Sequence, residues 1–208
     1  MSWLMKYARR GGSGENVTAK GGIGGDQHIS QYLPPGAVLT ALGGSYQAMT
    51  VTAGAALVVR PTTVPLATLW NGEAGGGKSL VIERAFAFNL VSSGPDTKYG
   101  IWLCVHPVGL AAIVDTITTK NNQAGKAGYG GNARMALATA VVDDGWFPWI
   151  GGGETVTWPL PGSMVVAEVN GRIIIPPTAS ISITVVATSI VNTFTAGFHW
   201  HEVQIDLG

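Results

Sequence analysis

Charge is scarce in this chain of 208 residues. Lys and Arg together number 12, Asp and Glu also number 12, and charged residues make up 12% of the sequence, roughly half the share that is usual in soluble domains. The balanced charge excludes an acidic solvating tail or a basic nucleic-acid-binding coat as the main design, so no nucleic-acid partner is expected. A free monomer needs charged surface to stay dispersed, whereas a surface covered by partners does not. The composition therefore favours a component of an assembly, and the alternative is a weakly charged secreted β domain.

Cysteine and long apolar runs are also nearly absent. The single Cys104 excludes an internal disulfide and a cysteine metal cluster, and its apolar neighbours predict a buried thiol. Cys104 and His106 share one face of a strand, but no cation is near in sequence to lower the pKa of the thiol, so no nucleophile is expected. No stretch reaches the ~18 uncharged apolar residues of a spanning helix, so no membrane partner is expected.

Glycine and proline are abundant, and residues 1–36 hold many of the glycines. The chain has 30 Gly and 11 Pro, which leaves little room for long helices. Gly11–Gly25 contains seven glycines and no apolar period, so we interpret residues 1–36 as a flexible or extended N-terminal arm. Trp3 and Leu4 are candidate anchors that would bury their side chains on another chain. The alternative is a disordered leader.

From residue 37 onward the pattern is typical of β-strands. Short apolar runs alternate with Gly, Pro and Asn breaks, and the βαβ alternation is missing. This predicts an all-β fold over residues 37–208, an antiparallel jelly-roll-like β-sandwich. The expected strands are Ala55–Arg60, Leu66–Trp70, Ser79–Val91, Tyr99–His106, Leu110–Thr118, Met164–Val169, Arg172–Ile175, Ala179–Ala187 and Phe198–Leu207.

Three details of this strand pattern are specific enough to be tested. Asn170-Gly171 predicts a type I′ turn that joins its two flanking strands as a hairpin. Strict alternation within Ser79–Val91 places Ile82, Arg84 and Phe86 on one face. Ala133–Val142 fits either a short helix or a strand.

Gly72–Ser79 matches the phosphate-loop pattern GxxxxGK[ST]. In the right context its backbone N–H groups would hold phosphates, with Lys78 on the terminal phosphate and Ser79 on Mg²⁺. A phosphate loop must open a helix, whereas Ser79–Val91 has the composition of a strand. We therefore interpret the segment as a wide hairpin loop and expect no cofactor, and a nucleotide-binding enzyme is the alternative.

His199 and His201 lie two residues apart and share one face of the last predicted strand. An HxH pair is a reasonable start for a metal site. The further ligands of a cupin-like site are missing after it, because the chain ends at Gly208 and the other histidines are His28 and His106. No metal is assigned, and an interfacial pair is the preferred interpretation.

Two adjacent aspartates precede the aromatic residues Trp146, Phe147 and Trp149. Adjacent carboxylates point to opposite sides of a strand and make a poor acid–base pair, so no catalytic residue is assigned. We interpret the segment as a surface loop whose three aromatic side chains pack on a neighbouring subunit. The alternative is carbohydrate binding by stacking on Trp146, Trp149 or Trp158.

The C-terminal third carries a resemblance to a known class. Pro161–Met164, Asn170–Pro177 and Phe198–Glu202 look like segments of bacteriophage virion proteins with a jelly-roll or tumour-necrosis-factor-like sandwich, in which a G-x-I-x-x-P-P strand start and a closing W-x-E strand recur. The glycine-rich arm before a compact β domain is similar to head decoration or fibre proteins. The resemblance implies a trimer that grips a shell by an arm or by one end of the sandwich, without a catalytic site.

Together these observations predict a structural protein of the virion and no enzyme. We expect an oligomeric capsid decoration or cement protein whose arm and apolar loops bury surface across the boundaries between capsid subunits. Its partners would be a capsid or tail protein of the same virion and further copies of itself, with a trimer favoured. A receptor- or carbohydrate-binding fibre or tail module is the alternative.

Overall fold

A computed structural model of the chain describes residues 4–6, 16–18, 35–63, 65–94, 97–106, 113, 117–126, 128–137, 145–153 and 164–205. The chain divides into two compact units, Met1–Ala37 and Val38–Gly208. In the first unit, β1 (Leu4–Lys6) and β2 (Asn16–Thr18) pair as antiparallel strands. Trp3 and the side chain of Leu4 lie outside the described part, so the predicted anchors stay a prediction.

Within the described residues, the larger unit contains eleven strands, and one short helix crosses from the first unit into it. The bounds are α1, Pro35–Ala41; β3, Ser45–Met49; β4, Gly54–Ala55; β5, Ala67–Asn71; β6, Ser79–Val91; β7, Lys98–Val105; β8, Lys120–Asn121; β9, Ala133–Leu137; β10, Trp146–Gly153; β11, Met164–Ile175; β12, Ser180–Ala187; and β13, Thr193–Val203. Among the residues that the structure describes, no helix has the length and apolar character needed to cross a membrane.

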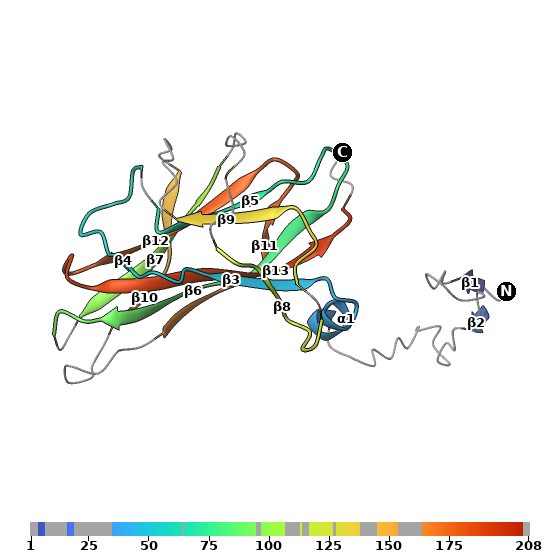
Figure 1. Cartoon of the computed structure of the whole chain (residues 1–208), viewed down its shortest axis with the longest axis horizontal. Helices are drawn as coiled ribbons and strands as arrows, with labels where there is room; N and C mark the ends of the chain where they lie inside the picture. Colours follow the sequence, from blue (N-terminus) through green and yellow to red (C-terminus); the bar gives the residue numbers. More distant parts are fainter. Residues whose placement is uncertain are drawn as a thin grey trace, which may run out of the picture. The chain divides into compact units, whose positions relative to one another are not determined.

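The strands of the larger unit form two antiparallel sheets that face each other (Figure 1). One sheet has the strand order β10-β7-β12-β5-β9, and the other has the order β11-β6-β13-β3-β8, with β4 added beside β13. From β10 to β13, successive strands cross from one sheet to the other, as the strands of a jelly roll do. The prediction of an all-β, jelly-roll-like sandwich is therefore confirmed.

Most of the predicted strands are present. Ser79–Val91 is β6 as predicted. The runs predicted near β5 and β7 differ from these strands by one residue at each end, and the run predicted near β12 differs by one residue at its start. The ambiguous segment after residue 132 begins as strand β9, and the last strand begins at Thr193 rather than Phe198. Leu110–Thr118 lies mostly outside the described residues.

Some predictions of strands and loops were wrong. The segment Ala55–Arg60, predicted as a strand, contains only the last residue of β4 and one isolated bridge at Leu57. It crosses the end of β12 and pairs with that strand at this single point. The predicted surface loop after Gly145 is strand β10, which β7 pairs along its length. Strand β3 and helix α1 were not predicted.

Asn170 and Gly171 do not form the predicted hairpin. Their φ values of 50° and 73° are positive, as a type I′ turn requires. However, Met164–Glu168 and Ile173–Ile175 both pair with β6 in the same direction, with a register shift between them. The residues between these segments therefore form a bulge within β11, because β6 already supplies a continuous partner to both sides.

A second irregularity lies in β6. Against β13, Arg84 pairs with His199 and Ile82 pairs with Trp200, so Glu83 is an extra residue on the β6 side. A bulge of one residue reverses the alternation of faces beyond it. The even-numbered residues of β6 therefore face the core before the bulge, and the odd-numbered residues face it after the bulge.

The bulge decides which side chains of β6 are buried. Ile82 lies in the core before the bulge, and Ala85 lies in the core after it. Arg84 and Phe86 lie on the outer face, Arg84 exposed and Phe86 half-buried. The prediction that Ile82, Arg84 and Phe86 share one face was wrong, because strict alternation does not continue through Glu83.

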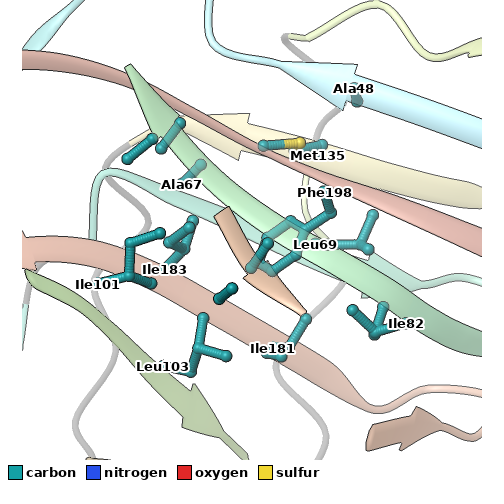
Figure 2. Close-up of a cluster of buried hydrophobic side chains, with 14 of the residues drawn as sticks. Ala48, Ala67, Leu69, Ile82, Ile101, Leu103, Met135, Ile181, Ile183 and Phe198 are labelled. Atoms are coloured by element: carbon teal, nitrogen blue, oxygen red, sulfur yellow. The ribbon is translucent and has the colours of Figure 1, made fainter. Parts of the chain in front are cut away.

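The core between the sheets is formed by aliphatic and aromatic side chains from both layers (Figure 2). Ile181 and Ile183 of β12 lie beside Leu69 of β5 and Leu103 of β7, and Phe198 of β13 faces them from the other sheet. All five side chains are fully buried. Burial of one such side chain contributes about 1.5–3 kcal/mol, so this layer is the main source of stability.

We predict that Gly171→Ala lowers the free energy of unfolding by about 1 kcal/mol, because alanine is strained at a φ of 73°. Its Cβ would also lie 3.3 Å from Val81 Cγ1. Gly75→Ala is the matched control, because no atom lies within 4 Å of a Cβ built there. Urea denaturation measures both variants, and equal stability of the two would contradict the strained bulge.

Candidate functional site

The phosphate-loop-like segment connects two strands. Gly77 N donates a 2.8 Å hydrogen bond to the Ala74 carbonyl, and Gly76 has a φ of 77°, so the loop closes as a tight turn. Ser79 then begins strand β6, which confirms the predicted extended chain. The loop therefore lacks the helix N-terminus that a phosphate loop uses to bind anions.

Glu202 of β13 ties this loop to a second loop. Its Oε2 lies 3.6 Å from Lys78 Nζ, and its Oε1 accepts a 2.5 Å hydrogen bond from the Tyr129 hydroxyl. The same hydroxyl accepts a 2.7 Å hydrogen bond from Ala133 N. Burial raises the pKa of Tyr129, and the adjacent carboxylate raises it further. Lys78 is thus engaged in a structural contact at the end of the closing strand.

The two histidines of β13 have different partners. The His199 ring packs edge-on against Phe86, with centroids 5.1 Å apart and an interplanar angle of 67°. His201 Nε2 lies 3.6 Å from Glu83 Oε1. Within the described ranges, no group of three or more His, Cys, Asp or Glu side chains is arranged to hold a metal ion. His28 lies outside the described residues.

Both histidines favour the neutral form. Burial lowers the pKa of His199, and the Arg84 guanidinium lowers it further, against a smaller opposite effect of Glu168. Burial also lowers the pKa of His201, while Glu83 raises it. Both rings are therefore neutral at neutral pH and add no positive charge to this face of the sheet.

The predicted aromatic interface residues separate in the structure. Trp146 is buried within its own chain, at 3% exposure, and its backbone pairs with Cys104 of β7. Phe147 and Trp149 remain partly exposed at the edge of the sheet, with ring centroids 5.7 Å apart. Trp158 lies outside the described part. Only Phe147 and Trp149 thus remain available, among the described aromatic residues of this cluster, for a partner or a sugar.

The five-stranded sheet carries a buried row on the face opposite the core. Cys104, Ser182 and Thr68 lie side by side in register across β7, β12 and β5, and all three are fully buried. Ser182 Oγ lies 2.8 Å from Thr68 Oγ1 and 2.8 Å from His106 Nε2. His106 Nδ1 lies 3.7 Å from Cys104 Sγ. The buried thiol was predicted correctly, and this row joins three strands by polar contacts.

Exposed apolar side chains gather at one end of the six-stranded sheet. Val91 pairs with Thr193 there, and the turn before Thr193 exposes two more apolar side chains. Leu90 adjoins Val91, and these side chains form a surface that we call the apolar end patch, made of Leu90, Val91, Ile190 and Val191. Exposed apolar side chains that lie together in this way are a candidate contact site.

The apolar end patch was not predicted, although the sequence contains a signal for it. Leu90-Val91 and Ile190-Val191 are apolar pairs at strand ends, where consecutive apolar residues cannot all face the core. Ile190 and Val191 are 63% and 57% exposed. Paired apolar residues next to turns are therefore the pattern that could have predicted the patch.

No protein-family model matches this sequence, no curated protein is detectably related to it, and no solved structure is similar enough to count as a match. The resemblance to bacteriophage virion proteins therefore stays a prediction from the sequence. The function has to be inferred from the patch and from the chemistry of the surfaces around it.

We predict that Ser182→Ala lowers the free energy of unfolding by about 1–3 kcal/mol, because it removes the hydroxyl that His106 and Thr68 both contact. Ser180→Ala is the control on the same strand. Ser180 is also fully buried, but its hydroxyl has no hydrogen-bond partner among the described residues. Chemical denaturation compares the two variants, and equal losses would refute the structural importance of the row.

We also predict a pH dependence that arises from His199 and His201. Their pKa values are lowered in the folded chain, so on acidification the unfolded chain takes up protons first. Stability is then fully present above the ordinary histidine pKa of about 6.5 and falls as the pH drops toward the folded values. Urea denaturation at several pH values should show a shallower fall for the double variant His199→Gln, His201→Gln. An unchanged slope would show that other groups cause the loss.

Proposed function

We propose that this chain is a structural protein of a bacteriophage virion, an oligomeric capsid decoration or cement protein that holds neighbouring capsid subunits together. The observation that carries the proposal is the apolar end patch, with four exposed apolar side chains at one end of a sheet. Charged residues make up only 12% of the chain, which suits a surface covered by partners. The proposal is further supported by the sequence resemblance described above.

The mechanism we propose is clamping by burial of apolar surface. Each side chain of the patch is only partly covered by its own chain, so covering the rest in a contact contributes about 1 kcal/mol per side chain. A repeated patch on identical subunits favours closed symmetry, and we propose a homotrimer. Phe147 and Trp149 at the sheet edge, with Trp3 and Leu4 of the arm, are the proposed second contacts to capsid or tail protein.

The proposal is tested by placing charges in the patch. We predict that Ile190→Lys with Val191→Lys weakens self-association of the full chain by about tenfold or more, because lysine cannot be buried in an apolar contact without cost. Sedimentation velocity over a concentration series measures the association. In purified particles, the copy number of the chain should equal the number of positions in the shell lattice.

The matched control is Leu42→Lys with Ile174→Lys. These two side chains are 74% and 37% exposed and lie at the opposite end of the six-stranded sheet. We expect their association to equal that of the wild type. A chain that stays monomeric at high concentration, or a copy number of only a few per particle, would contradict the decoration role.

A further inference from the structure

A groove of about 580 Å³ crosses the outer face of the six-stranded sheet. Strands β3, β6 and β11 line it with the apolar side chains of Met49, Phe86, Met164 and Val166. Its size falls within the range of small-molecule sites, and its lining is predominantly apolar with a few polar groups, as such sites usually are. Thr118 and Lys120 close the groove on the side of β8.

The depth of the groove depends on Gly197 in the central strand β13. In register, Gly197 lies between Phe86 of β6 and Met49 of β3. A Cβ at Gly197 would collide with the Ala48 carbonyl oxygen and would lie 2.7 Å from Phe86 Cζ. The Phe86 ring therefore lies over bare backbone, and the space between the flanking side chains stays open.

The polar groups around the groove carry a net positive charge. Arg84 Nε lies 3.0 Å from Glu168, so these two charges compensate each other. Lys120 is exposed and forms no ion pair among the described residues. His199 beside Phe86 is neutral at neutral pH, because its pKa is lowered. Among the described residues, the Lys120 ammonium group thus stands uncompensated at one end of an apolar groove, which favours a ligand with a single negative charge.

We propose that this groove binds an amphiphilic monoanion, a carboxylate with an unbranched hydrocarbon chain. The chain lies along Met49, Phe86 and Val166, and the carboxylate lies at Lys120. Methionine side chains adapt to flexible apolar ligands, which suits Met49 and Met164 on opposite sides of the groove. This binding activity goes beyond the proposed assembly role and does not depend on it.

The methionines provide a direct test with decanoate as the probe. The chain has five methionines, of which Met49 and Met164 line the groove and Met135 is fully buried in the core. In methyl-labelled protein, decanoate should shift the NMR signals of Met49 and Met164 and leave that of Met135 unchanged. Decyltrimethylammonium, with the same chain and the opposite charge, should bind about tenfold more weakly or not at all.

Two variants separate the apolar and the charged contributions. Val166→Trp fills the groove without adding charge and should weaken decanoate binding about tenfold, whereas Ile174→Trp, on the same strand outside the groove, should not change it. Lys120→Gln should weaken decanoate about threefold and should remove the preference for decanoate over the ammonium probe. An unchanged Met135 signal in each variant shows that the core is intact.

Several outcomes would overturn the proposal. These are shifts of Met135 equal to those of Met49 and Met164, equal binding of the two probes to the wild type, or full affinity in Val166→Trp. Binding of anionic phospholipid vesicles without binding of free decanoate would also overturn it. The assembly role is tested by Ile190 and Val191, which lie outside the lining of the groove, so failure of one proposal leaves the other standing.

Discussion

The extra residue at Glu83 is the constraint on which the outer face of this sandwich depends. Two strands, β13 and β11, both shift register against β6 at this point. Without the shift, Arg84 would share the face of Ile82 and would have to be buried, at a prohibitive cost for an unpaired charge. With the shift, small alanines fill the core side of β6, and Arg84 reaches Glu168 on the outside. The same reversal places Phe86 over Gly197, so the core and the groove are set by one bulge.

Polar side chains connect loops and neighbouring strands at positions outside the apolar core. Glu202 joins two loops through Lys78 and Tyr129 at the end of β13. On the other sheet, Ser182 joins three strands through His106 and Thr68. Buried polar contacts stabilise only if they are satisfied, and for that reason they also fix the strand register. The lone thiol and the lysine of the phosphate-loop-like segment thus contribute to the architecture.

The sequence predicted those strands whose local composition and turn residues agree with their pairing in the sheets. Strand β6 was found with both its ends, because turn residues precede it and its composition is uniformly β-like. Strand β10 was taken for a loop, because Pro148 and three consecutive glycines are typical of loops, and only pairing with β7 makes it a strand. The hairpin at Asn170 failed for the same reason, since a local turn signal does not reveal that β6 pairs with both sides. The apolar end patch and the groove combine residues from distant segments of the chain, and no local pattern encodes such a combination.

The edge strand β10 limits how copies of this chain can join. Pro148 offers no backbone N–H to an incoming strand, and the register shift beside it bends the edge away from a regular ladder. Continuous growth of the five-stranded sheet into fibrils is therefore disfavoured along this side. A charge-poor chain whose sheet edge resists such growth is protected from open-ended aggregation on this side, and the faces and ends of the sandwich are left for the contacts of the proposed closed assembly.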